Sequence, residues 1–255
     1  PYPVDTTSDV VMAKLEEVRD DFIWATARAL YDEPDKLATD EEEVADYLIQ
    51  VAKEKDHEVM VEAAYVILGP EGVERTRVNR ERGISQRLLT NSLATNDVAA
   101  AHAGYAKYRK AILRNGVELY ELRPAASSVR NNWSVLAGRS KASMHTMASV
   151  VDRELVTIGS FNVDPRSFAL NTEIVILVES PELAAQVLDY MNKGTLPENS
   201  YRVMLETDEE TGAERLVWIT EIDGEEVRYY SEPEVGLWRR FSSWFMGLLP
   251  IEKHL

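Results

Sequence analysis

The sequence predicts an α/β fold: a mixed, mostly parallel sheet sandwiched by helices, with a small antiparallel β extension and a C-terminal amphipathic helix. Three observations predict it. Strand-like and helix-like stretches alternate between residues 59 and 122, which is typical of parallel strands joined by helices. Three short strand-like stretches follow residue 200, and Asp223-Gly224 between the last two is a hairpin signal. The final apolar stretch repeats at helical spacing.

The first segment, residues 1–55, is predicted to be a helical linker that leads into the main lobe. Apolar residues recur at spacings of three and four between Val11 and Ala29, and again between residues 44 and 51. The acidic run at 40–43 suits the positive end of the second helix dipole. Because the chain starts with Pro1 rather than Met, we expect a processed product or a piece of a longer protein.

The second segment, residues 56–196, is predicted to be the main lobe. Asn115-Gly116 is typical of a helix end, and Pro181 suits the first turn of a helix. The predicted elements are, in order, a strand at 59–68, a turn at 69–72, a helix at 73–82, a strand at 84–90, a helix at 98–114, a strand at 117–122, a loop at 124–142, strands at 143–151, 155–160 and 172–178, and a helix at 181–191.

The third segment, residues 197–255, is predicted to be an acidic β-meander followed by the amphipathic helix. Strands are expected at 201–205, 216–220 and 227–230. The stretch from Glu206 to Glu234 holds eleven acidic residues against two arginines, so the meander carries much of the negative charge of the chain.

Composition excludes several classes of function. The 255 residues include 28 Lys and Arg against 44 Asp and Glu, which gives a net charge of −16 and argues against a nucleic-acid binder. There is no Cys, and no two of the four His stand at metal-ligand spacing, so neither a disulfide nor a metal site is expected. No apolar run reaches the roughly 20 residues of a spanning helix.

A cluster of polar residues marks the candidate site. Alternate side chains of a strand share a face, so His145, Met147 and Ser149 are expected to point the same way, and Ser160 and Asn162 likewise. If the two strands pair, an imidazole, hydroxyls and an amide form one patch that suits a tetrahedral oxyanion, with the imidazole as nucleophile or acid. The alternative is a lone His on a half-buried strand among ordinary polar neighbours.

Together these residues closely resemble the phospholipase D superfamily, specifically its cardiolipin-synthase-like branch. The superfamily pattern is H-x-K-x4-D, followed by G-S-x-N and a later acidic residue. Here His145 and Asp152 stand at the first spacing, residues 159–162 read Gly-Ser-Phe-Asn, and Glu173 is the later acid. Similar stretches also occur at 90–94, 102–105, 117–122, 164–167, 171–173, 237–241 and 249–252, so the resemblance covers nearly the whole chain.

Two departures from the family pattern matter. Position 147 holds Met instead of the Lys that contacts the substrate phosphate in the family, and losing that cation costs on the order of several kcal/mol of transition-state stabilisation. Whether Met147 is natural or engineered stays open. Members of this branch also carry two motifs that meet at one site, and only one is present here, which predicts the C-terminal half of a longer enzyme.

The resemblance implies a phosphohistidine mechanism that needs no cofactor and no metal. One His attacks phosphorus and the other protonates the leaving alcohol; by analogy His145 is the acid and later the base. Ser160 and Asn162 would hold the phosphate, Glu173 would orient a His, and Asp152 would brace the fold. The remaining candidates for substrate contact are Met147, Ser149, Arg166 and His102, the last of which fits a packed helix position equally well.

The C-terminal stretch fits two interpretations. Its apolar residues share one helix face, and two Trp and two Phe beside paired Arg suit a lipid interface; equally, the helix packs on its own domain. The residues expected to contact a membrane are Trp238, Phe241, Trp244, Phe245 and Leu248.

Three hypotheses follow. The first is one half of a phosphatidyltransferase, impaired by Met147, with phospholipid as substrate and an N-terminal half or a second copy as partner. The second is a non-catalytic lipid-binding or scaffolding module. The third is a homodimeric phosphodiesterase, of which a nuclease is disfavoured by the charge of −16. The resemblance implies a peripheral protein on the cytoplasmic side of a bacterial membrane.

Overall fold

The computed structural model describes residues 58–126, 143–169, 171–209 and 211–247. The helices predicted within residues 1–55, most of the predicted loop at 124–142, and Leu248 lie outside these ranges. In chain order the elements are β1 (Glu58–Ala63), α4 (Gly69–Glu81), β2 (Ser85–Asn91), α5 (Ala99–Arg114), β3 (Glu118–Leu122), β4 (Met147–Val151), β5 (Leu155–Gly159), α6 (Pro165–Ala169), β6 (Val175–Glu179), α7 (Pro181–Gly194), β7 (Ser200–Thr207), β8 (Glu214–Ile222), β9 (Glu225–Tyr229) and α8 (Leu237–Gly247).

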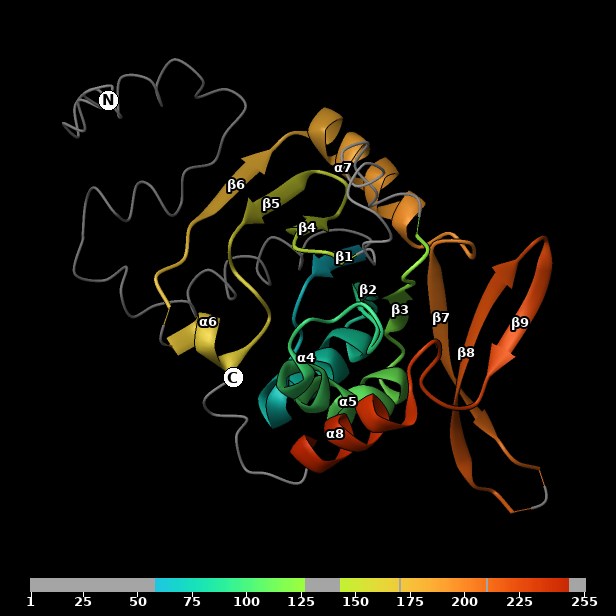
Figure 1. Ribbon diagram of the computed structural model, residues 1–255. Coiled ribbons are helices and arrows are strands. Elements are labelled where there is room, and N and C mark those ends of the chain that lie inside the picture. Colours follow the sequence, from blue (N-terminus) through green and yellow to red (C-terminus); the bar gives the residue numbers. More distant parts are fainter. Residues whose placement is uncertain (1–57, 127–142, 170, 210, 248–255) are drawn as a thin grey trace, which may run out of the picture.

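The strands form one sheet with helices on both faces, which confirms the predicted α/β fold (Figure 1). The strand order is β6-β5-β4-β1-β2-β3-β7-β8-β9. The sheet is mixed as predicted, but it is not mostly parallel: of the eight pairings in the described residues, only β1 with β2 and β2 with β3 are parallel. A parallel pairing needs a long crossover connection, and only α4 and α5 supply crossovers between neighbouring strands.

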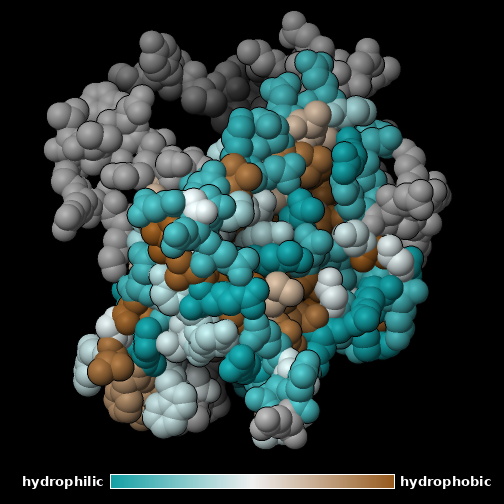
Figure 2. Space-filling model, turned by 90° about the vertical axis from the view of Figure 1, so that its right-hand side faces the viewer, coloured by the Kyte–Doolittle hydropathy of each residue, from teal (hydrophilic) through white to brown (hydrophobic). Residues whose placement is uncertain are grey.

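The C-terminal meander extends this same sheet, because β7 pairs antiparallel with β3. The division of the chain at residue 196 therefore stays a prediction, with no break in the sheet at that point. Seen from the side where β8 and β9 lie, the surface is mostly hydrophilic, with hydrophobic residues in separate groups (Figure 2). Within the described ranges, no helix is long and apolar enough to cross a membrane.

Two tight turns set the antiparallel register. Asp152 and Arg153, between β4 and β5, have φ values of 54° and 59°, and Asp223 and Gly224, between β8 and β9, have φ values of 52° and 82°. The β8–β9 turn has two residues between the paired Ile222 and Glu225, and positive φ at both is what a two-residue hairpin needs to match the strand twist. The β4–β5 turn is one residue longer, with residues 152–154 between the paired Val151 and Leu155. The first turn is held from outside the hairpin, because the amide of Glu58 donates to Asp152 Oδ1 at 3.0 Å.

Two apolar cores lie on the two faces of the sheet. On one face, Tyr105 and Ile112 of α5 pack against Leu88, Leu119 and Val203 of the strands. On the other face, α7 contributes a set of side chains that packs on β1, β4, β5 and β6, including Ala184 and Met191. The helix α7 begins at a capped residue, because the Ser180 side chain accepts from the Leu183 amide at 3.2 Å. The sheet centre is thus buried on both sides, and its polar residues gather at strand ends.

Candidate active site

His145 lies where β1 and β2 end and β4 is about to begin. Its side chain is 63% exposed, and its Nε2 lies 4.0 Å from Asp97 Oδ2. The predicted strand at 143–151 starts only at Met147. The residues before it do not join the sheet, because the side chain of Asn91 bonds the backbone of Met144 instead. The imidazole is therefore held at the sheet edge by a residue from β2.

Glu173 gathers three donors on the neighbouring segment. Ser167 Oγ donates to its Oε1 at 2.9 Å, Asn171 Nδ2 to the same oxygen at 3.1 Å, and Ser160 Oγ bonds Oε2. Burial alone would raise the pKa of Glu173, but these three hydrogen bonds outweigh it and hold the pKa below its ordinary value. Glu173 thus stays ionised, and its partners are hydroxyls and an amide.

Among the described residues, Glu173 makes no contact with a His ring, so the expected contact stays a prediction. Both oxygens of Glu173 are engaged by Ser160, Ser167 and Asn171, while the imidazole of His145 faces Asp97. The reason is geometric, since Glu173 lies just before β6, two strands away from the start of β4. The carboxylate beside the imidazole is supplied by the turn after β2.

Tyr65 connects these two groups. Its hydroxyl donates to Asp97 Oδ1 at 2.6 Å, and its backbone amide donates to Asn162 Oδ1 at 3.1 Å. The backbone amide of Asn162 in turn donates to Ser167 Oγ at 3.3 Å. Burial, together with the contact to Asp97, raises the pKa of the Tyr65 phenol, so it remains a proton donor. A continuous chain of polar contacts therefore runs from His145 to Glu173, through Asp97, Tyr65, Asn162 and Ser167.

The charged partners at this edge are acidic. Asp97 and Glu173 are carboxylates. Within the described residues, no lysine or arginine forms a hydrogen bond or ion pair with His145, Ser160, Asn162 or Glu173. Met147, at the family's Lys position, pairs with Ala63 of β1 in the sheet and offers no donor. The arrangement can present hydroxyl, amide and imidazole groups to a phosphate, but among the described residues no cation takes the place of the family's Lys.

The other predicted site residues lie in different settings. Ser149 bonds Thr157 across the β4–β5 pair at 2.6 Å, inside the sheet, and so does not join the patch. Asp152 contacts the Glu58 amide at the opposite end of β4. Arg166 is exposed on α6 and donates to Asn171 at 3.1 Å. Because side chains alternate along a strand, the sequence predicts Ser149 on the same face as His145. His145, however, lies before the first residue of β4.

His102 takes the packed alternative. Its side chain is fully buried in α5, with Nε2 at 3.3 Å from Glu232 Oε1 and 3.4 Å from Arg109 Nη2. A completely buried imidazole presents no surface to a head group, so the structure does not support the suggested substrate contact, which stays a prediction. The partner Glu232 lies 130 residues later in the chain, which is why the sequence left the choice open.

Sequence reasoning missed Asp97 and Tyr65 as site residues. Both stand in stretches that follow strands, and the carboxyl ends of parallel strands meet at one edge of a sheet. Glu62 was missed as well: it is 2% exposed on β1, and burial raises its pKa to about 7. In the part of the chain that the structure describes, no group of three or more His, Asp or Glu side chains is arranged to hold a metal ion.

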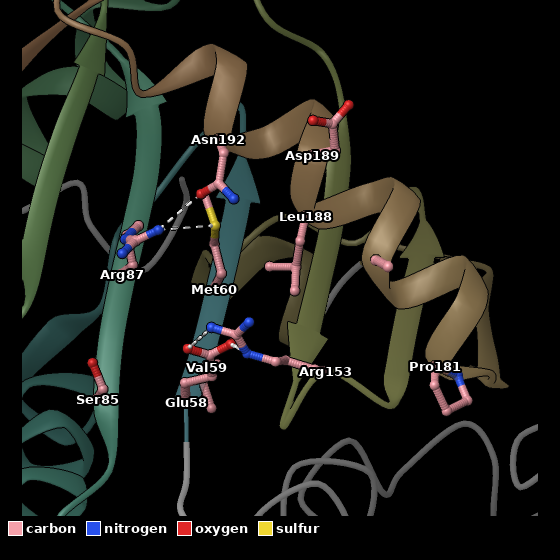
Figure 3. Close-up of a pocket in the computed structure, with 11 residues that line it drawn as sticks. Glu58, Val59, Met60, Ser85, Arg87, Arg153, Pro181, Leu188, Asp189 and Asn192 are labelled. Carbon is pink, nitrogen blue, oxygen red and sulfur yellow. Dashed lines mark hydrogen bonds and ion pairs between the residues drawn. The ribbon is translucent and has the colours of Figure 1, made fainter.

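A pocket of about 310 Å³ lies elsewhere, between β1, β2 and α7 (Figure 3). It opens beside Glu58 and Met60, at the opposite end of β1 from the His145 edge. Its two arginines already have acidic partners, since Arg87 pairs with Glu118 at 3.0 Å and Arg153 pairs with Glu58 at 2.6 Å. Both arginines are therefore neutralised by carboxylates, and none of the predicted site residues lines the pocket.

Comparison with known proteins decides the family. Residues 47–194 match the family described as "Cardiolipin synthase, PLD-like domain". The chain belongs to this family. The resemblance seen in the sequence is thereby confirmed.

Individual relatives agree with this assignment. Cardiolipin synthase C of Escherichia coli (strain K12) is 34% identical over 235 residues, which cover 90% of this chain and 48% of the relative. An uncharacterized protein of Helicobacter pylori is 31% identical over 131 residues, 51% of this chain and 25% of its own length. This PLD-like chain therefore spans about half, or less, of the length of the curated relatives it matches.

Solved structures also match, at lower similarity. The phospholipase D family member Nuc from Salmonella typhimurium is 16% identical with a TM-score of 0.41, covering 58% of this chain and 85% of that one. The phosphatidylserine synthase of Haemophilus influenzae Rd KW20 is 15% identical with a TM-score of 0.44, covering 60% and 35%.

Proposed function

We propose that this chain supplies one half of a phospholipase-D-type active site that transfers phosphatidyl groups, with His145 as its reacting imidazole. The observation that carries the proposal is the polar chain from His145 to Glu173 at one sheet edge, in a chain of the PLD-like cardiolipin synthase family. The exposed imidazole is open to substrate, and the side-chain NH2 of Asn162 offers a neutral donor on the neighbouring segment. The substrate class is a phospholipid phosphodiester.

The proposed chemistry needs a second imidazole. One His attacks phosphorus, forming a P–N bond while the P–O bond to the leaving alcohol breaks, and the other His gives that oxygen a proton. An acceptor alcohol then loses its proton to the same His as its oxygen attacks phosphorus and the P–N bond breaks. We assign the acid and base steps to His145. The nucleophile comes from an N-terminal half with the first motif, or from a second copy.

Met147 impairs this chemistry in the proposal. A Lys there would place a cation on the phosphate, whereas a thioether provides neither charge nor donor. Asp97 and Glu173 make the deficit worse, because both repel a phosphate. This observation favours the second candidate function, a lipid-binding or scaffolding module that keeps the fold without turnover.

The test restores the missing cation. The chain carrying Met147→Lys is combined with an N-terminal half that has a complete motif, and cardiolipin formed from phosphatidylglycerol is measured. We expect a rise of about 100-fold or more over the Met147 chain, comparable to the value of one positioned transition-state contact. Met147→Leu controls for altered packing, and Met147→Lys with His145→Ala controls for background turnover.

The outcomes separate the hypotheses. Product that depends on both Lys at position 147 and His145 supports the transferase. A folded, reverted and complete assembly that forms no product overturns it and leaves the binding module. Activity of the Met147→Lys chain without any companion, at a dimeric mass in solution, would instead support the homodimeric phosphodiesterase, and a strictly monomeric mass removes that option.

A further inference from the structure

Helix α8 displays an aromatic ridge, formed by Leu237, Trp238, Phe241, Trp244 and Phe245. Leu237, Trp238 and Trp244 are 82%, 79% and 61% exposed. The rings touch in sequence, with Phe241 5.9 Å from Trp238, 5.9 Å from Trp244 and 6.3 Å from Phe245 between centroids. A continuous apolar surface of this kind on a protein marks a place of interaction.

The ridge is exposed because α8 is docked by its polar side. A surface helix ordinarily turns its apolar face inward. Here Arg239 bonds the carbonyl of Asn96, Arg240 donates to the carbonyl of Glu232 at 2.6 Å, and Ser243 is buried. The helix lies against α5, where Gly247 approaches Ala103 (Figure 1). With both arginines bonded inward, the aromatic side chains are left facing out.

The segment before α8 is fastened into the protein. Glu232 accepts from Arg109 Nη2 at 2.6 Å, and Arg109 also pairs with Glu121 at 3.1 Å; the side chain of Arg109 is only 2% exposed. Despite its burial, Glu232 has a lowered pKa because Arg109 and His102 lie beside it. Removing one partner of a buried ion pair is costly, so this attachment holds α8 in its orientation.

The surface around the ridge has the chemistry of a bilayer interface. Helices α5 and α8 contain no Asp or Glu, in a chain whose net charge is −16. Of their Lys and Arg side chains, Arg109 is buried, Arg239 and Arg240 bond inward, and Lys110 and Arg114 bond Glu214. Lys107 is exposed one turn beyond Ala103, where α8 ends. Trp and Phe are typical of segments that lie in the interface of a bilayer, so these rings, on helices without carboxylates, point to a lipid layer as the partner.

The ridge is also linked to the candidate site. Arg239 bonds the carbonyl of Asn96, and the next residue, Asp97, faces His145 at 4.0 Å. The turn that carries Asp97 is thus held between α8 and the imidazole. This turn therefore connects the helix that bears the ridge to the segment beside the imidazole.

We propose that the aromatic ridge of α8 inserts into the head-group layer of a bilayer that contains anionic phospholipid, and so places the His145 edge at the lipid surface. The insertion itself stands on the exposure, docking and charge of α5 and α8. The statement about His145 rests on the proposed function.

The test is flotation of the full chain with vesicles of phosphatidylcholine and phosphatidylglycerol. Phe241→Ser combined with Trp244→Ser removes the centre of the ridge, and Leu196→Ser, at an apolar side chain that is 41% exposed between α7 and β7, is the matched control. We expect the double variant to bind at least about tenfold more weakly, because each ring loses its burial in lipid. The control should bind as the unaltered chain does.

Two results would overturn the proposal. One is equal vesicle binding by the folded double variant and the control. The other is a ridge that mediates self-association, seen as a fall in mass of the double variant with vesicle binding unchanged. Thermal unfolding of each variant checks folding, and quenching of tryptophan fluorescence by brominated lipid, compared between the unaltered chain and the double variant, tests insertion directly. None of these readouts needs turnover, so failure here is distinct from failure of the transferase proposal.

Discussion

Asn91 and Met144 exchange two hydrogen bonds. Asn91 Nδ2 donates to the Met144 carbonyl at 2.9 Å, and the Met144 amide donates back to Asn91 Oδ1 at 3.0 Å. The same Nδ2 donates to the carbonyl of Ala64 at 3.2 Å. One buried side chain thereby joins the ends of β1 and β2 to the residue before His145. The position of the imidazole depends on this amide as much as on β4.

The first prediction is that Asn91→Ala lowers the free energy of unfolding by about 2–4 kcal/mol, because it leaves buried backbone groups of Met144 without partners. Urea unfolding measures the change. Asn192→Ala, at an exposed amide that bonds Arg87, should shift it by less than about 0.5 kcal/mol. Equal effects at the two positions would show that the Asn91 contacts do not hold this edge.

The second prediction concerns pH and Glu62. Burial raises its pKa from 4.5 to about 7, so between these values the folded state binds more protons than the unfolded state. The free energy of unfolding therefore falls as pH rises through this window. Glu62→Gln removes this pH dependence. The free energy of unfolding of the variant, relative to that of the unaltered protein, should therefore rise by about 3 kcal/mol between pH 4.5 and pH 8.

Unfolding at several pH values measures this effect. Glu179→Gln makes the same change in net charge at an exposed position and serves as the control. A Glu62→Gln difference that is constant from pH 4.5 to pH 8 would contradict a raised pKa.

The third prediction concerns Gly159, where β5 passes close to β6. A Cβ atom there would lie 2.1 Å from the carbonyl oxygen of Ile174 and 2.9 Å from Val175 Cα. Gly159→Ala should force the strands apart, cost about 1–3 kcal/mol or more, and expose the Ser160 amide, which bonds the Ile174 carbonyl at 2.9 Å. Amide hydrogen exchange at Ser160 measures the opening.

Gly236→Ala is the control, because a Cβ at that position meets no atom within 4 Å. Unchanged exchange at Ser160 in Gly159→Ala would mean that the two strands accommodate the methyl group elsewhere.

The fourth prediction concerns the attachment of α8. Glu232→Ala leaves the guanidinium of Arg109 with Glu121 as its remaining ion-pair partner, at a site where both side chains are buried. We expect a loss of about 3–5 kcal/mol in unfolding free energy, with faster hydrogen exchange along α8. Glu74→Ala removes an exposed partner of Arg77 on α4 and should leave both measurements unchanged. Protection of α8 that survives Glu232→Ala would place its attachment elsewhere.

Local patterns locate part of the candidate site. Ser160 and Glu173 lie together because they are close in sequence and meet across a short connection, whereas the expected contact of Glu173 with a His ring is not among those of the described residues. Alternation along a strand says which side chains share a face, but not where the strand stops. The predicted strand at 143–151 therefore began too early. The observed strand β4 starts at Met147, and ahead of it Asn91 bonds the backbone of Met144.

Contacts between distant segments were out of reach. Tyr65 and Asp97 meet across 32 residues, and nothing local says which turn residue will face His145. The setting of His102 likewise depends on Glu232, far along the chain. The antiparallel pairings of β4 to β9 depend on the order of the strands in the sheet, which local sequence does not reveal. Periodicity carries no information about such long-range partners.

The position of β1 inside the sheet has a consequence for synthesis on the ribosome. Val59 is paired with Gln86 on one side and with Val151 on the other. Gln86 follows Val59 by 27 residues, whereas Val151 follows it by 92 residues and emerges much later. Until then Met60 and Val61 lie on an open strand edge, which is a template for wrong pairing. Truncation between β3 and β4 would make that transient hazard permanent.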